Sequence, residues 1–194
     1  MILVLCGKTC SGKDTIKKKL CKDFEFENIV TCTTRPPRKG EIDGVDYNFM
    51  TEEEFKQTDM LEVTHYNVAD GSTWYYGSMF KDFLQKDNND VRPNKVIIMN
   101  PDGLSVLNEY SGIRENCFIV YVFADKDTIY QRLEKRGDNR DEANRRVAAD
   151  DADFKNINNL IDCKVNNIGD IGDAVWSILD NFQRKVEEVT GEYE

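Results

Sequence analysis

Residues 2–15 read ILVLCGKTCSGKDT, and this stretch decides the fold. Its first part, Ile2–Cys6, is an apolar run without polar alternation, which is typical of a strand buried on both faces of a parallel sheet. A loop framed by Gly7 and Gly12 follows, and Lys13 stands directly after the second glycine. A buried strand, a glycine-framed loop and a helix-compatible segment in this order predict a phosphate-binding loop.

The chemistry of this loop favours a nucleoside triphosphate. Glycines let successive backbone N–H groups converge on one anion, and the helix that begins near Lys13 adds the positive end of its dipole. The Lys13 ammonium supplies a full charge for the outer phosphates of a nucleoside triphosphate. The alternative, a glycine-rich turn with an incidental lysine, is disfavoured by the buried strand before it. We expect a nucleoside triphosphate, which the resemblance described below identifies as ATP, to contact Gly7, Lys8, Thr9, Cys10, Ser11, Gly12, Lys13, Asp14 and Thr15.

One position departs from the usual pattern of such loops. The residue after the lysine is normally Ser or Thr, whose hydroxyl ligates Mg²⁺. Here Asp14 takes that place and Thr15 follows. A carboxylate can hold Mg²⁺ directly or through water, so we expect Asp14 or Thr15 to hold the Mg²⁺ that accompanies ATP.

The composition limits the classes of protein to consider. The chain has 194 residues with 40% apolar residues, enough for one domain with a sizeable core. Its net charge of -10 argues against nucleic acid as a partner. The sequence contains neither an apolar run of transmembrane length nor a signal-peptide pattern, so we expect no membrane association. The six cysteines form no CxxC pair, which disfavours zinc and redox sites and favours a cytoplasmic location.

A second segment with anion-binding chemistry lies at residues 31–49, which read TCTTRPPRKGEIDGVDYNF. Arg35 and Arg38 are separated by two prolines that stiffen the backbone. Arginine matches phosphate oxygens bidentately, and a rigid segment lowers the entropic cost of that match. The alternative is an exposed basic turn. In an acidic chain that also carries a phosphate loop, a second phosphate site is the better interpretation.

These residues resemble the nucleoside monophosphate-binding segment of guanylate kinases, whose pattern is TTRxPRxGExxGxDYxF. The resemblance implies that Glu62 accepts hydrogen bonds from the N1 and N2 hydrogens of guanine, and that Ser78 lies near its O6 atom. It also implies contacts from Tyr47 and Tyr76 to the acceptor phosphate. The residues of this chain that match the pattern are Thr33, Thr34, Arg35, Pro37, Arg38, Gly40, Glu41, Gly44, Asp46, Tyr47 and Phe49. The GMP-binding residues implied by the resemblance are Thr31, Arg35, Arg38, Tyr47, Glu62, Tyr76, Ser78 and Asn100.

The chain departs from the family after the strand expected at residues 95–99. Guanylate kinases usually have a sequence close to DIDxQG there, whereas this chain has Ile98 and Asn100 in place of the acidic residues, and Asp102 in place of the Gln. Asparagine offers both a donor and an acceptor, so it does not select guanine as clearly. A kinase of this family with a changed base preference therefore remains an alternative.

Arginines gather around a predicted break between two helices, at residues 125–136 and 141–154. They are Arg132, Arg136, Arg140, Arg145 and Arg146. In guanylate kinases the corresponding segment is a lid that folds over ATP. The resemblance implies that Arg132 and Asn166 bind ATP and that Lys13, Arg35, Arg136 and Arg146 are catalytic. The alternative is a solvated, salt-bridged helix pair, which the glycine at the break disfavours.

Strands and helices alternate through most of the chain, which predicts an α/β fold of the three-layer P-loop type, with a parallel sheet, an inserted GMP-binding subdomain and a helical lid. The expected core is 1–30, 79–135 and 155–194, the subdomain 31–78 and the lid 136–154. Further strands are expected at 28–32, 62–68, 73–78, 118–123 and 160–167. Further helices are expected at 15–22, 79–85, 103–110 and 170–189. A capping box of Thr51 and Glu54 predicts the start of one more helix, and Asp70–Gly71 predicts the turn of a hairpin between the strands 62–68 and 73–78.

The resemblance implies ATP-dependent phosphorylation of GMP, and of dGMP, by a monomer or homodimer. The alternative from another class is a non-catalytic binding module of the same fold, but such modules usually lack a workable phosphate loop and lid.

Overall fold

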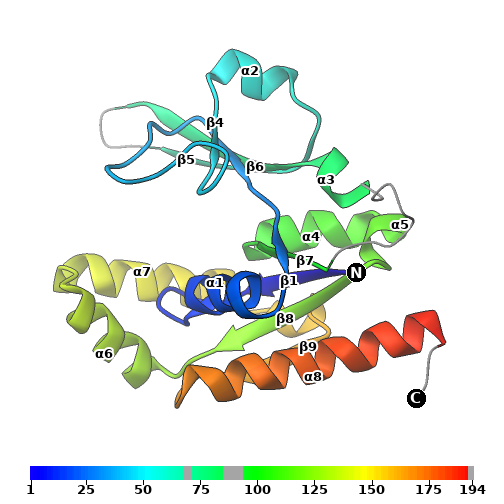
Figure 1. Cartoon of the computed structure of the whole chain (residues 1–194). Helices are drawn as coiled ribbons and strands as arrows, with labels where there is room; N and C mark the ends of the chain where they lie inside the picture. Colours follow the sequence, from blue (N-terminus) through cyan, green and yellow to red (C-terminus); the bar gives the residue numbers. More distant parts are fainter. Residues whose placement is uncertain (68–70, 85–93, 192–194) are drawn as a thin grey trace.

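In the computed structural model, which describes residues 1–67, 71–84 and 94–191, the centre of the molecule is a five-stranded sheet (Figure 1). All paired neighbours in it run parallel, as expected for strands joined by helical crossovers. The strand order is β2 (Glu27–Asn28), β7 (Lys95–Ile98), β1 (Ile2–Cys6), β8 (Cys117–Phe123) and β9 (Cys163–Asn166).

Helices cover both faces of this sheet, which explains the continuous apolar runs in its strands. Because successive side chains of a strand point to opposite faces, β1 contributes to two cores. Ile2, Val4 and Cys6 pack toward α4 (Pro101–Glu109) and α5 (Ser111–Arg114). Leu3 and Leu5 pack on the other side, toward α1 (Lys13–Asp23) and α8 (Ile171–Thr190). The predicted three-layer α/β fold is confirmed.

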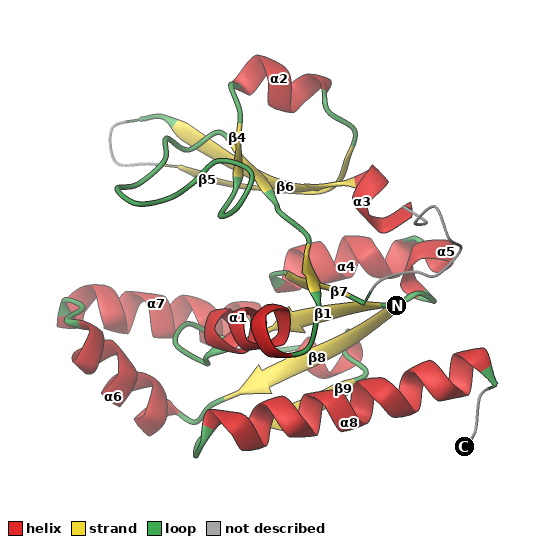
Figure 2. Cartoon of the chain, viewed as in Figure 1, coloured by secondary structure: helices red, strands yellow, loops and turns green. Residues whose placement is uncertain are grey.

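A smaller four-stranded sheet stands apart from the central one (Figure 2). The strands Cys32–Thr33 and Asn48–Phe49 pair in parallel, and the other pairs of strands in this sheet are antiparallel. A short helix, α2 (Glu52–Gln57), begins at a capping box of Thr51 and Glu54, and α3 (Phe80–Leu84) leads out of the sheet. The strand order is β4 (Asn48–Phe49), β3 (Cys32–Thr33), β6 (Thr73–Met79) and β5 (Met60–Asn67).

The predicted single strand at residues 28–32 is wrong. Its beginning belongs to β2 in the central sheet, where Ile29 N–H donates to Val96 O at 3.0 Å. Its end belongs to β3 in the small sheet, where the Thr31 carbonyl accepts from Asn48 N–H at 2.9 Å. The chain passes from one sheet to the other within these residues, and only the partners of each strand reveal this.

The arginine-rich region forms two helices, α6 (Lys126–Arg136) and α7 (Arg140–Asp153), as predicted. Gly137 ends α6 with a left-handed backbone (φ 83°), and the Asn139 side chain caps the start of α7. A small apolar cluster that includes Leu133 and Val147 joins the two helices. A 3₁₀ turn at Ile157–Asn159 follows.

Parts of three predicted elements lie outside the described residues: position 68 of the strand 62–68, position 85 of the helix 79–85, and position 70 of the hairpin turn. No helix within the described ranges is both long and apolar enough to cross a bilayer.

Candidate active site

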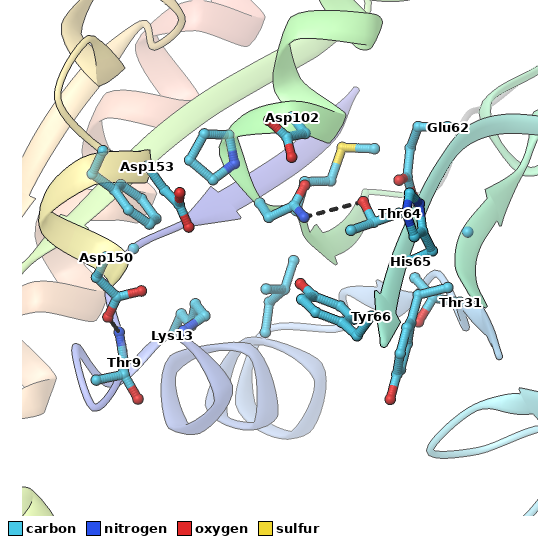
Figure 3. A pocket seen from close by; sticks show the side chains of 18 of the residues that line it. Thr9, Lys13, Thr31, Glu62, Thr64, His65, Tyr66, Asp102, Asp150 and Asp153 are labelled. Atoms are coloured by element: carbon cyan, nitrogen blue, oxygen red, sulfur yellow. Dashed lines mark hydrogen bonds between the residues drawn. The ribbon is translucent and has the colours of Figure 1, made fainter. Parts of the chain in front are cut away.

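A cavity of about 520 Å³ lies between the central sheet and the small sheet (Figure 3). One wall is the loop between β1 and α1, with Thr9 and Lys13, and the opposite wall is the small sheet, with Glu62. The remaining walls come from the β7–α4 junction and the C-terminal end of α7. Of the site residues predicted from the sequence, those that line this cavity are Gly7, Thr9, Lys13, Thr31, Tyr47, Glu62, Tyr76 and Asn100.

The loop after β1 has the backbone geometry of an anion-binding loop. Gly12 has φ 97° and precedes the first residue of α1, so the N-terminus of this helix opens beside the cavity. A Cβ atom at Gly7 would lie 2.6 Å from Val122 O, so only glycine fits there. The Lys13 ammonium donates to Lys8 O at 3.3 Å. The Lys13 side chain is thus folded back over the loop.

Arg132, which the resemblance implies as an ATP ligand, supports this loop through its carbonyls. It donates to Cys10 O at 3.0 Å, to Ser11 O at 3.2 Å and to Asn167 O at 2.8 Å. The side chain of Asn167 donates to Ser11 O at 2.7 Å. Because C=O and N–H point in opposite directions across a trans peptide, these bonds aim the Gly12 N–H away from Arg132. The sequence analysis did not single out Asn167, which is buried. It named Asn166 instead, which is exposed at the end of β9.

Glu62 and Ser78 lie opposite each other on β5 and β6. The Ser78 hydroxyl donates to Glu62 Oε1 at 2.8 Å. Burial raises the pKa of the Glu62 carboxyl, and the hydrogen bonds from Ser78 oppose this rise. A half-buried carboxylate held in one orientation can accept hydrogen bonds from the edge of a base, as the resemblance implies.

Two residues of β5 that the sequence analysis did not single out also line the cavity, namely Thr64 and Tyr66. The period of two in a strand could have identified them, because it brings them to the same face as Glu62. Thr64 Oγ1 accepts from Asn100 Nδ2 at 3.1 Å (Figure 3). Asn100 Oδ1 accepts from Gly103 N–H at 2.8 Å. Asn100 therefore serves as the N-cap of α4, with both ends of its amide engaged.

Arg35 is almost fully buried, with 3% of its surface exposed, and does not line the cavity. Its Nη2 donates to both carboxylate oxygens of Glu41, at 2.9 and 3.0 Å. Its guanidinium carbon lies 5.5 Å from the ring centre of Tyr47, which does line the cavity beside Tyr76. Arg38 is exposed, and its backbone N–H donates to Glu41 at 2.6 Å. Glu41 thus organises both arginines of the Arg-Pro-Pro-Arg segment.

Arg136, Arg145 and Arg146 pair with carboxylates of α7 and of the turn between α6 and α7. Arg136 binds Asp138, with Nε to Oδ1 at 2.9 Å. Arg146 Nε donates to Glu142 Oε1 at 2.7 Å. Hydrogen bonds from Arg145 and Arg146 lower the pKa of Glu142 to about 2. Neither Arg136 nor Arg146 lines the cavity in this arrangement.

The C-terminal end of α7 brings carboxylates to the phosphate loop. Asp150 and Asp153 line the cavity, and Asp150 accepts from Thr9 N–H at 2.7 Å. The sequence analysis assigned this helix to the lid but did not single out these residues. The cluster of acidic residues at positions 150–153 was the sequence signal that could have identified them.

The oxygen donors near the loop suit a hard cation. Asp14 and Thr15 are exposed in the first turn of α1. The described residues contain no group of three or more His, Cys, Asp or Glu side chains that would hold a metal ion by themselves. Mg²⁺ is usually held in such sites through one or two carboxylates, with phosphate oxygens and water completing its octahedron.

Three comparisons with known proteins all find similarity to guanylate kinases. Residues 1–184 match the family model described as guanylate kinase. A guanylate kinase of Lactobacillus delbrueckii subsp. bulgaricus is 31% identical, with 97% of each chain covered. Guanylate kinase 2, chloroplastic/mitochondrial, of Oryza sativa subsp. japonica is 31% identical over 98% of this chain and 67% of its own. The crystal structure of guanylate kinase from Anaplasma phagocytophilum has the same fold, with a TM-score of 0.68 at 22% identity over 95% of this chain and 85% of that one.

Proposed function

Because the chain belongs to the guanylate kinase family, we propose that it transfers the γ-phosphoryl group of ATP to GMP, giving ADP and GDP, and that it accepts dGMP as well. One observation of this structure carries the proposal. A single cavity is lined on one side by the phosphate loop with Lys13 and on the other by Glu62, Tyr47 and Tyr76. Two anion sites from different parts of the fold therefore face each other.

The chemistry requires mainly positioning. The acceptor phosphate is already a dianion and needs little deprotonation, so the chain must orient two phosphates and neutralise their charge. Mg²⁺ bound with ATP supplies part of that neutralisation, and Asp14 or Thr15 would hold it. The loop amides and Lys13 hold the triphosphate of ATP. Asn166 is proposed on the adenine side of the same site.

The acceptor would be held at both ends. Glu62 accepts from the base and Ser78, buried behind it, fixes the carboxylate. Tyr47, Tyr76 and Thr31 line the cavity on the same side and would contact the phosphate. Arg35 and Arg38 lie on the segment that carries Tyr47. Arg35 would neutralise the phosphate once Glu41 shares its guanidinium, since a phosphate dianion competes well for a guanidinium, and Arg38, which binds Glu41 only through its backbone N–H, would add its charge.

Residues 136–154, which run from the end of α6 through α7, would act as the lid. Arg136 and Arg146 are exposed and now pair with the half-buried carboxylates of Asp138 and Glu142, and ion pairs that reach solvent contribute little to stability. The more highly charged phosphates of two bound nucleotides can therefore recruit these arginines. Closure would also exclude water and so limit hydrolysis of ATP.

The base preference rests on Glu62 and Ser78. Asn100 is engaged with Gly103 and Thr64, so its amide does not select between purines in this arrangement. The base preference therefore depends on Glu62 and Ser78, which support guanine. A changed base preference is an outcome that the test below would detect. The non-catalytic alternative is disfavoured by the phosphate loop, which keeps Gly7, Gly12 and Lys13.

A panel of the five common nucleoside monophosphates, assayed by coupled detection of ADP with and without Mg²⁺, tests the proposal. We expect GMP to rank first and the reaction to need Mg²⁺. Lys13→Ala should abolish turnover, whereas Lys18→Ala, an exposed lysine of the same helix, should not. AMP or UMP ranking above GMP would contradict the guanine assignment. Absence of turnover with every nucleotide would contradict the kinase assignment.

We also propose a cytoplasmic location, as a monomer or homodimer without nucleic-acid or membrane partners. The net charge of -10 and six free thiols support this.

A further inference from the structure

The C-terminal end of α7 already contacts the phosphate loop through a carboxylate. Asp150 Oδ2 accepts from the backbone N–H of Thr9 at 2.7 Å (Figure 3). Both residues line the cavity, on the side where Lys13 lies. This contact has no part in the phosphoryl transfer described above.

The neighbouring residue reinforces the contact. Asp151 Oδ1 pairs with Lys8 Nζ at 2.5 Å, and its other oxygen pairs with Lys126 Nζ at 2.7 Å. Two consecutive carboxylates of α7 thus engage two consecutive residues of the loop, Lys8 and Thr9. The side chains of consecutive helical residues point about 100° apart, so this arrangement fixes both the position and the rotation of the helix end.

A carboxylate oxygen on a loop N–H occupies the kind of position that a phosphate oxygen takes in an anion-binding loop. The charged and titratable groups around Asp150 are Lys8 and Lys13 from the loop and α1, Asp153 from its own helix and Tyr121 from β8. Asp150 is half-buried, and this burial raises its pKa against the opposing effect of Thr9 and the two lysines. A desolvated negative charge beside the loop disfavours a second anion at short range.

We propose that Asp150 is an internal competitor of ATP: its carboxylate accepts the hydrogen bond of the Thr9 amide when the loop is empty, and the triphosphate displaces it, which leaves the Asp151–Lys8 ion pair as the contact of α7 with the loop. This inference rests on the proposed function, because the competing anion is the triphosphate of ATP. It assigns Asp150 a regulatory contact rather than a place among the residues that bind substrate.

Two substitutions separate the charge of Asp150 from its hydrogen bond. Asp150→Asn keeps an oxygen that can accept from Thr9 but removes the charge. Asp150→Ala removes both. If the carboxylate competes with phosphate, each variant binds ATP more tightly than the unmodified protein, by about tenfold for the loss of a nearby like charge.

Asp153→Asn is the matched control. Asp153 lies on the same helix and lines the same cavity, but no hydrogen bond from it to the loop is found among the described residues. It therefore reports the general effect of removing a negative charge from the cavity, for which we expect a change in the dissociation constant of less than about twofold.

The experiment is calorimetric titration of the full chain with Mg²⁺-ATP in the absence of any monophosphate, so that no transfer occurs. Exchange of the Thr9 amide hydrogen, measured by NMR, supplies the second readout. We expect it to be slow in the unmodified protein and fast in Asp150→Ala. Thermal unfolding of each variant shows that it is folded, and Asp150→Asn remains available should the alanine variant not fold.

The outcomes separate the two proposals. If the unmodified protein binds ATP and Asp150→Asn binds it no more tightly, the competition is wrong while the kinase assignment stands. An equal gain in Asp153→Asn would also overturn the competition, because the effect would then belong to the cavity charge. If the unmodified protein does not bind ATP at all, both proposals fail.

Discussion

Ser78 and Glu62 form a hydrogen-bonded pair across the β5–β6 hairpin, with the serine hydroxyl 2.8 Å from Glu62 Oε1. Ser78 is fully buried and Glu62 reaches into the cavity. The serine thus fixes one oxygen of the carboxylate from behind, and the other oxygen remains on the side of the base site.

Ser78→Ala is expected to raise the KM for GMP about tenfold with little change in kcat. The loss of one hydrogen bond to a charged group costs about 1.5 to 3 kcal/mol, part of which a rearranged carboxylate recovers. Steady-state kinetics with GMP varied at saturating ATP measures this. Ser105→Ala, an exposed serine of α4, is the control and should leave both constants unchanged. An equal fall in kcat and kcat/KM would argue against a role in GMP binding.

The stability of the protein should depend on pH through Glu62. Burial raises the pKa of its carboxyl in the folded state, so the folded state binds the proton more tightly than the unfolded chain. The resulting stabilisation is fully present below the ordinary glutamate pKa of about 4.3 and is lost as the pH rises through the raised value.

Urea unfolding of the unmodified protein and of Glu62→Gln, from about pH 4 to pH 8, measures this effect. The glutamine keeps an acceptor for Ser78 and does not titrate. We expect the unfolding free energy of the unmodified protein to decline relative to that of the variant as the pH rises. A difference that is constant over the whole range would show that Glu62 has an ordinary pKa.

Arg132→Lys should weaken both the fold and ATP binding. The guanidinium joins three carbonyls, those of Cys10, Ser11 and Asn167, and an ammonium cannot reproduce this planar arrangement. We expect the unfolding free energy to fall by about 2 kcal/mol. Arg184→Lys, on the exposed face of α8, should change it by less than about 0.5 kcal/mol. Unaltered stability together with lost ATP affinity would instead indicate that Arg132 contacts the nucleotide directly.

Gly12→Ala should destabilise the loop for two reasons. The backbone there has φ 97°, which a residue with a Cβ atom adopts only with strain, and the new methyl group would collide with the Asn167 side chain. We expect the free energy of unfolding to fall by at least about 1 kcal/mol, and ATP binding to be lost. Gly112→Ala, in the short helix α5 with open space around its Cα, is the control and should be neutral or slightly stabilising. Differential scanning calorimetry with and without ATP compares the two variants.

Local signals in the chain were sufficient for much of the architecture. The run Ile2–Cys6 is buried along its whole length, as its lack of polar alternation predicts. The break after Arg136 and the capping box at Thr51 lie where the sequence indicates them. Each of these features depends on residues within one turn or one strand, so pattern and propensity identify them.

Features that depend on distant partners were not predictable in the same way. The segment 28–32 has the pattern of one strand, yet it serves two sheets. Arg132 was expected at the phosphates of ATP, and in this structure it holds the loop carbonyls. The contact of Asp150 with Thr9 joins residues far apart in the chain.

By itself, the amino-acid sequence determined the α/β alternation, the phosphate loop and the motif that places the chain near guanylate kinases, because spacing along the backbone encodes all three. Only the tertiary structure decided which polar groups meet: Glu62 with Ser78, Arg35 with Glu41, and Asp150 with the loop. The physical reason is that a hydrogen bond depends on distances of about 3 Å between atoms, and those distances are fixed by packing of the whole fold rather than by any local pattern.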